Sequence, residues 1–83
     1  MAKVKLTPVF RTPVEKIAIT TEFIRLDNFL KFANAAETGG MAKTFIQEGE
    51  VKVNGIVCTQ RGKKLRVGDT VEFDGVTMAV AGA

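Results

Sequence analysis

The chain has 83 residues, enough for one small domain with a modest core. Its 12 basic and 9 acidic residues give a formal net charge of +3, a mild excess that alone is weak evidence for a nucleic-acid partner. Because the chain has one cysteine and no histidine, an intramolecular disulfide and a Cys/His zinc site are excluded. No apolar run could span a membrane or form a secretory signal. We therefore expect a cytoplasmic protein without metal or cofactor.

Residues 1–14 include both prolines and show no clear period, so we expect an N-terminal arm that is partly ordered or simply solvated. The domain proper then covers residues 15–83. Residues 15–20 alternate between polar and apolar side chains, with Ile17 and Ile19 on one side, which predicts a first strand. We expect the chain to turn from this strand directly into a helix.

Two short amphipathic helices are predicted next. Apolar residues recur at helical spacing in two sets, which are Leu26, Phe29, Leu30 and Ala33, and then Met41, Ala42, Phe45 and Ile46. Thr38 can cap the second helix, and Gly49 stands where a left-handed residue ends it. Each helix is marginal alone, so we expect the apolar stripes to pack on each other and on the strands that follow.

A hairpin is predicted after the second helix, because Asn54-Gly55 is a strong turn signal between two apolar runs. This turn would pair Val53 with Ile56 and Val51 with Cys58. We expect all four of these side chains to share the face that forms the core, which makes the cysteine a small buried apolar residue and not a nucleophile.

The last third of the chain predicts a second hairpin. Leu65 and Val67 are expected to point inward before a turn at Gly68-Asp69, and Asp74-Gly75 has the same turn chemistry as the first hairpin. Residues 81–83 are expected to fray. The class is therefore α+β, with two packed short helices against a small, mostly antiparallel sheet.

Several sequence pieces occur in a recognisable order: Arg25-Leu26-Asp27 with Leu30, then Ala42, then Gly-Glu-Val-Lys-Val-Asn-Gly at residues 49–55, then Gly68-Asp69. Over roughly residues 19–73 the chain resembles the S4-type RNA-binding domain, also called the alpha-L motif. It looks closest to the small single-domain bacterial S4-like proteins of the YbcJ/YaaA kind. One position departs from the family pattern: its Ser-Arg pair falls on Thr38-Gly39, so the arginine is missing.

The resemblance implies a protein that holds structured RNA on a surface made by the two helices and the following hairpin, and that reads RNA shape more than base identity. Carried over by position, the implied RNA contacts are Arg25, Lys43, Lys52 and Asn54. Ribosomal RNA is the first expectation and transfer RNA the second. We expect a monomer.

The charge distribution adds candidates of its own. Residues 51–68 contain five basic residues and no acidic one, whereas acids cluster just before and just after this run. A basic run is often only a solvated face, but a concentrated patch suits an anionic polymer better than an even spread does. This run adds Arg61, Lys63, Lys64 and Arg66 to the predicted RNA-binding surface.

The helices carry further candidates. Arg25, Asn28 and Phe32 share a flank of the first helix, with Lys31 further round. An exposed phenylalanine beside a cation could stack on a base, or it could pack under the N-terminal arm. Backbone N–H groups at Gly39-Gly40 could hold a phosphate at the start of the second helix, or these glycines could only permit a tight turn.

We expect no catalysis. The chain has no histidine and no serine, and the spacing of a phosphate-binding loop is not met. Two other functions remain open. Residues 65–73 look like part of a ubiquitin-like sulfur carrier, although the chain ends in Ala-Gly-Ala and not in Gly-Gly, and a protein-interaction module is therefore one alternative. An accessory ribosome-assembly factor that acts by protein contacts is the other.

Overall fold

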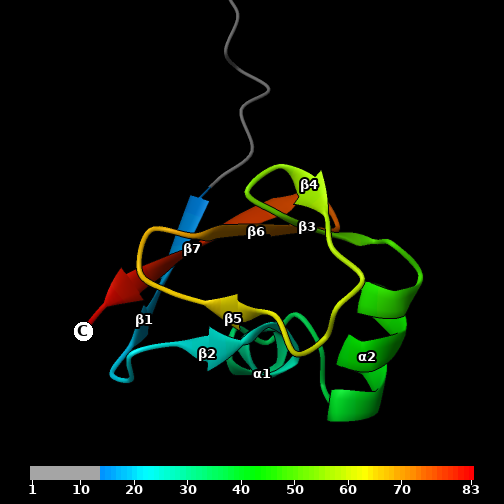
Figure 1. Ribbon diagram of the computed structural model, residues 1–83, viewed down its shortest axis with the longest axis horizontal. Helices are drawn as coiled ribbons and strands as arrows, with labels where there is room; N and C mark the ends of the chain where they lie inside the picture. Colours follow the sequence, from blue (N-terminus) through cyan, green and yellow to red (C-terminus); the bar gives the residue numbers. More distant parts are fainter. Residues whose placement is uncertain (1–13) are drawn as a thin grey trace, which may run out of the picture.

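The structure, a computed structural model, describes residues 14–83, which form seven strands and two helices (Figure 1). The predicted N-terminal arm lies outside these residues, apart from Val14, which begins the first strand. In chain order the elements are β1 Val14–Ile19, β2 Ile24–Arg25, α1 Leu26–Phe32, α2 Gly39–Gln47, β3 Val51–Val53, β4 Ile56–Val57, β5 Lys64–Leu65, β6 Thr70–Phe73 and β7 Val76–Gly82.

The strands form a five-stranded sheet in the order β1-β7-β6-β3-β4 and a separate two-stranded ribbon of β2 and β5. Every pairing is antiparallel except that of β1 with β7, which is parallel. Both helices and the ribbon lie on one side of the five-stranded sheet (Figure 1). The predicted α+β class, with two packed helices against a mostly antiparallel sheet, is confirmed.

The core lies between the helices and the sheet. From α1 it takes Leu26, Phe29 and Leu30, which are fully buried as their helical spacing predicts. From α2 it takes Ala42 and Ile46. The half-buried ring of Phe45 packs on that of Phe73 in β6, with ring centroids 4.6 Å apart, and so ties α2 to the sheet. Met41 differs from the expectation, since it is 39% exposed.

Local sequence signals fix where α2 begins and ends. The side chain of Thr38 accepts a hydrogen bond from the N–H of Met41 at 3.1 Å, as a helix cap does. At the other end Gly49 has φ of +79°, and the N–H groups of Gly49 and Glu50 donate to carbonyls of the last helical turn. This is a Schellman-type ending, which favours glycine because a side chain there would be strained.

Both predicted hairpin turns are present. Asn54-Gly55 and Asp74-Gly75 all have positive φ, as the type I′ turn requires. Val53 lies opposite Ile56 as predicted, and the second hairpin pairs β6 with β7, with Phe73 opposite Val76. The turns therefore set the register of four of the five strands in the main sheet.

The expected direct turn from β1 into α1 is wrong, because β2 lies between them. Ile24 lies opposite Leu65, and Arg25 lies opposite Lys64. A strand of two residues is too short to show a period, and its partner lies far along the chain, at Lys64–Leu65, so no local pattern reveals it.

Two apolar residues expected in the core are exposed. Ile56 is 73% exposed because β4 is a two-residue strand at the outer edge of the sheet. Cys58, in the same part of the chain, is only half-buried. Val67 is 60% exposed because it occupies a turn in which the N–H of Asp69 bonds to the carbonyl of Arg66.

The C-terminal end is paired and not frayed. β7 continues to Gly82, which lies opposite Ile19 of β1, and the N–H of Ala83 donates to the Ile19 carbonyl at 3.2 Å. This segment is held by β1, its parallel partner from the opposite end of the domain. Local composition does not show such a long-range pairing.

Candidate nucleic-acid interface

The ribbon of β2 and β5 fastens the basic loop to the start of α1. The first free N–H groups of this helix need acceptors, and the loop supplies them. Leu26 donates to the Lys63 carbonyl at 2.8 Å, and Asp27 donates to the Arg61 carbonyl at 3.1 Å. Two cation-bearing segments that are far apart in the sequence are thus joined by backbone hydrogen bonds.

Asp27 organises two arginines at this junction. Its carboxylate lies 3.2 Å from Nη2 of Arg25 and 3.9 Å from Nε of Arg61, and its side chain is only 13% exposed. The guanidinium of Arg25 also lies against Gly62, where an added Cβ would come within 3.7 Å of it. One acid thus holds two cations side by side, and the group keeps a net positive charge.

Phe23 orders two more cations beside this pair, and sequence reasoning missed it. Nζ of Lys64 lies 4.8 Å from the centre of its ring, and the guanidinium carbon of Arg66 lies 5.8 Å from it. Both are within the range of cation–π attraction. Arg66 also comes within 4.0 Å of Glu22. The contact of this ring with the two cations follows from the pairing of β2 with β5, and no local sequence pattern shows that pairing.

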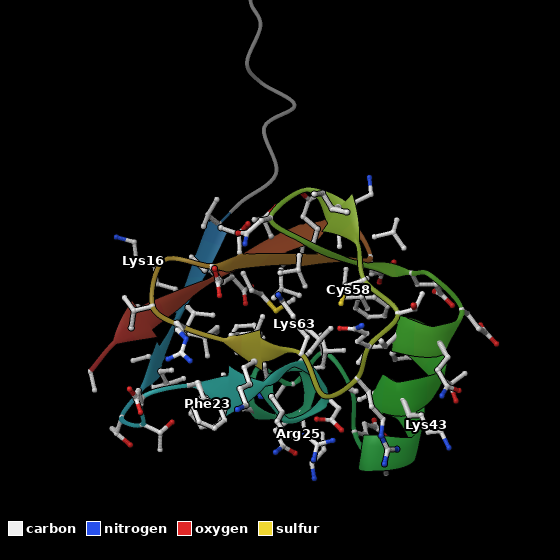
Figure 2. The ribbon with its side chains drawn as sticks, in the orientation of Figure 1. Lys16, Phe23, Arg25, Lys43, Cys58 and Lys63 are labelled. Atoms are coloured by element: carbon white, nitrogen blue, oxygen red, sulfur yellow. The ribbon has the colours of Figure 1, made fainter. Side chains whose placement is uncertain are left out.

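We call these cations the basic face, which consists of Arg25, Arg61, Lys63, Lys64 and Arg66. All five are exposed. Within residues 14–83, Lys63 and Lys64 form no ion pair with a carboxylate. In Figure 2, Phe23 and Arg25 lie on the side of the molecule that β2 and the helices form, whereas Lys16 lies away from them on β1.

A second group of predicted residues meets at the start of α2. The side chain of Lys31 lies beside Gly39, where an added Cβ would be 4.0 Å from its Cδ. Lys43 is exposed one turn further along α2 (Figure 2). Among the first backbone N–H groups of α2, that of Met41 donates to the side chain of Thr38. The N–H groups of Gly39 and Gly40 have no acceptor among residues 14–83.

The predicted flank of α1 is open to solvent in the part of the chain that the structure describes. Asn28 is exposed, and the ring of Phe32 is 59% exposed. The alternative that this ring packs under the N-terminal arm concerns residues outside the described range.

Lys52 is not brought together with the basic face. It stands between the buried Val51 and Val53, so its side chain leaves the opposite face of the sheet, and its cross-strand neighbour is Glu72. The lysine therefore lies beside an acid.

Asn54 uses its amide within the fold. Its Nδ2 donates to Asp69 at 3.1 Å, and its Oδ1 accepts from the N–H of Thr70 at 2.9 Å. The two sequence pieces that carry the family resemblance here, the Asn-Gly turn and the Gly-Asp turn, are therefore in direct contact.

Charge is segregated in the domain. Residues 14–83 contain nine basic and nine acidic residues, so the net charge of +3 comes from three cations in residues 1–13. Acids gather in two places, which are the connection from α2 to β3, with Glu48 and Glu50, and the β6–β7 turn, with Asp74. The pKa of Glu50 is raised by its hydrogen bond with Glu48 and by the nearby negative charges of Glu48 and Asp74. The basic face is thus a local feature of a domain whose residues 14–83 carry no net charge.

The pKa of Asp69 shifts in the opposite direction to that of Glu50. The Asp69 pKa is lowered by the hydrogen bond from the Arg66 N–H, then by that from Asn54 and by the charges of Lys63 and Arg66. The carboxylate accepts the Arg66 N–H at 2.8 Å and so stabilises the turn at the end of the basic loop.

No group of three or more potential metal ligands comes together in residues 14–83. Neither α1 nor α2 is long and apolar enough to cross a membrane.

Comparison with known proteins points to one family. The model of the S4 domain matches residues 17–81. One relative is the "Probable ribosome maturation protein RlbA" of Bacillus subtilis (strain 168), which is 52% identical over 71% of this chain and 83% of that protein. Another is the "Putative RNA-binding protein YbcJ" of Escherichia coli (strain K12), which is 40% identical over 69% of this chain and 81% of that protein.

Two solved structures share the fold. The solution structure of E. coli YbcJ, described as revealing an alpha-L motif involved in RNA binding, superposes with a TM-score of 0.58 at 29% identity and covers 95% of this chain and 99% of that one. The trimeric structure of Vibrio cholerae Heat Shock Protein 15 gives a TM-score of 0.65 at 23% identity, over 75% of this chain and 66% of that one.

Proposed function

This chain belongs to the S4 domain family, and from that premise we propose that it binds structured RNA through the basic face. The observation that carries the proposal is the junction at Asp27. Backbone hydrogen bonds and a shared carboxylate place Arg25 beside the Arg61–Arg66 loop, so that five cations lie along one ribbon and the start of one helix. Cations fixed in this way can meet successive phosphates of a folded RNA.

The group at the start of α2 extends this surface. Lys31 and Lys43 add cations, and the free N–H groups of Gly39-Gly40 offer donors to a phosphate of the RNA at the helix start. The exposed ring of Phe32 and the amide of Asn28 are suited to an unpaired base at the edge of the contact. We leave Lys52 and Asn54 out of the proposed surface, because one lies beside an acid and the other is used within the fold.

Ribosomal RNA is the RNA that we propose first, and transfer RNA second. The name of the B. subtilis relative, a probable ribosome maturation protein, supports this order. We further propose a non-catalytic protein that acts as a monomer in the cytoplasm.

The alternatives of a ubiquitin-like carrier or another protein-interaction module have no observation in their favour beyond the short likeness at residues 65–73. Treatment with ribonuclease distinguishes direct RNA binding from an accessory factor that reaches the ribosomal particle by protein contacts. Co-sedimentation with the particle that survives ribonuclease would favour protein contacts, and loss with ribonuclease or added salt would favour RNA.

The test compares two variants that each lose two positive charges from exposed lysines. Lys63→Gln with Lys64→Gln removes them from the basic face, and Lys16→Gln with Lys52→Gln removes them from outside it. Binding to a labelled ribosomal RNA fragment is followed by fluorescence anisotropy at several salt concentrations. We expect the first variant to bind more weakly, with a salt slope smaller by about 2, or about one per lost phosphate contact.

The second variant should keep a salt slope close to that of the unsubstituted protein. Equal weakening by both variants would show that net charge alone drives binding, and unchanged affinity in the first variant would contradict the basic face. Far-ultraviolet circular dichroism of both variants checks that the fold is kept.

A further inference from the structure

An open hollow of about 400 Å³ lies between the β3–β4 turn and the connection from β4 to β5. Its apolar lining includes Ile56, Val57 and Cys58, and its polar lining includes Thr59, Gln60 and Lys63. The volume exceeds what one side chain fills and suits a planar group of the size of a nucleobase with space for water around it.

Two exposed apolar side chains of the hairpin border the hollow. Ile56 is 73% exposed and Val57 is 50% exposed, and they are adjacent on an edge strand. Scattered exposed apolar residues need no explanation, but a pair that borders a hollow is typical of a binding site.

Lys63 connects the hollow to the basic face. Its carbonyl accepts the hydrogen bond from Leu26 at the start of α1, and the same residue lines the hollow. A polyanion that follows the cations of the basic face therefore reaches the mouth of the hollow without a break.

We propose that the hollow receives the base of one unpaired nucleotide of the RNA held on the basic face, with the phosphate of that nucleotide on Lys63; this inference rests on the proposed function. A base offers an apolar face to Ile56 and Val57 and a polar edge to Thr59 and Gln60. The side chains of these last two make no hydrogen bond with other residues of the described range, so their donors and acceptors are free. Asn54 is excluded as a reader because its amide is used by Asp69 and Thr70.

A nucleotide fits this site better than an apolar side chain of a protein does. The polar groups and the lysine would stay unpaired against an apolar side chain, at a cost in desolvation. A nucleotide brings an anion for the lysine and hydrogen-bonding groups for the other two residues.

The test uses three labelled RNA hairpins of one sequence: with a single-nucleotide bulge, with the same bulge lacking its base, and fully paired. The protein should bind the bulged hairpin more tightly than the other two, by about fivefold or more. Two matched variants then locate the effect, since Val57→Ala and Val14→Ala remove the same atoms from side chains that are 50% and 54% exposed.

Val57→Ala should reduce the affinity for the bulged hairpin toward that for the hairpin without the base, and Val14→Ala should leave the difference intact. Equal affinity for bulged and base-less hairpins would overturn the inference while leaving the proposed function in place. Failure of all three RNAs to bind at low salt would overturn both. Unchanged RNA affinities in Val57→Ala combined with weaker co-sedimentation with ribosomal particles would assign the hollow to a protein partner and would also overturn the inference.

Discussion

The side chain of Asn54 connects two turns through hydrogen bonds to residues 15 and 16 positions further along the chain. It has φ of +52°, which asparagine tolerates better than most residues, and its amide bonds to Asp69 and to the N–H of Thr70. In the same way Asp27 is used to hold two arginines. At this scale, polar residues within the family-like sequence pieces position the cations, and the lysines of the loop are left free to bind.

We predict that Asn54→Gly and Asn54→Ala separate the two roles of this asparagine. Glycine accepts the positive φ and loses only the side-chain bonds, so it should lower the free energy of unfolding by about 1 kcal/mol. Alanine adds the strain of a left-handed residue and should lower it by about 2 kcal/mol. Urea unfolding followed by circular dichroism measures both, and a larger loss for glycine than for alanine would contradict this account.

We predict that the ring of Phe23 strengthens RNA binding by ordering Lys64 and Arg66. Phe23→Leu keeps an apolar side chain but removes the attraction of the ring for cations, and should weaken RNA binding about threefold. Phe23→Tyr keeps the ring and should bind as the unsubstituted protein does. The salt slope should be the same for all three proteins because their charges are equal, and a loss in the tyrosine variant as large as in leucine would count against the role of the ring.

At the scale of elements, the parts with strong local signals were predictable and the parts made by distant pairing were not. The helical spacing of Leu26 and Phe29 and the two Asn-Gly and Asp-Gly turns gave both helices and both hairpins. The ribbon of β2 and β5 has two residues in each strand, and the parallel pairing of β1 with β7 joins opposite ends of the domain, so neither leaves a local pattern. The side chain of Ile56 was predicted wrongly because alternation gives the side of a strand and cannot show that β4 is a two-residue strand at the outer edge of the sheet.

The turn that ends the basic loop should make stability depend on pH. The folded state lowers the pKa of Asp69 below its ordinary value, so this carboxylate stabilises the fold above that ordinary value, and the stabilisation is lost as the pH falls through the lowered pKa. Asp69→Asn keeps an oxygen acceptor and cannot titrate. Its free energy of unfolding should therefore fall less steeply than that of the unsubstituted protein below about pH 4.

Glu50 should show the opposite sign. Its raised pKa means that its contribution to stability is present below the ordinary value and is lost as the pH rises through the raised pKa. Glu50→Gln should therefore be at least as stable as the unsubstituted protein at pH 7. Urea unfolding at pH 7 measures this, and a clear loss of stability in the variant would contradict the repulsion among Glu48, Glu50 and Asp74.

At the scale of the whole molecule, the arrangement of charge matters more than its sum. Residues 14–83 carry no net charge, yet the cations that line the ribbon lie apart from the acids of the α2–β3 connection and the β6–β7 turn. The sequence identified which cations form a run, and it could not show which of them share a carboxylate, because Asp27 meets Arg61 only in the folded chain. The separation of charge gives the domain one face for a polyanion.

The most direct test of this face is a titration of the isotope-labelled protein with a structured ribosomal RNA fragment, followed by backbone amide NMR. We predict that the largest shifts and broadening fall on residues 23–31 and 61–66, while the amides of Lys16, Glu72 and Asp74 stay unchanged. Shifts centred on β1 or on the β6–β7 turn, with the amides of residues 61–66 unmoved, would contradict the account.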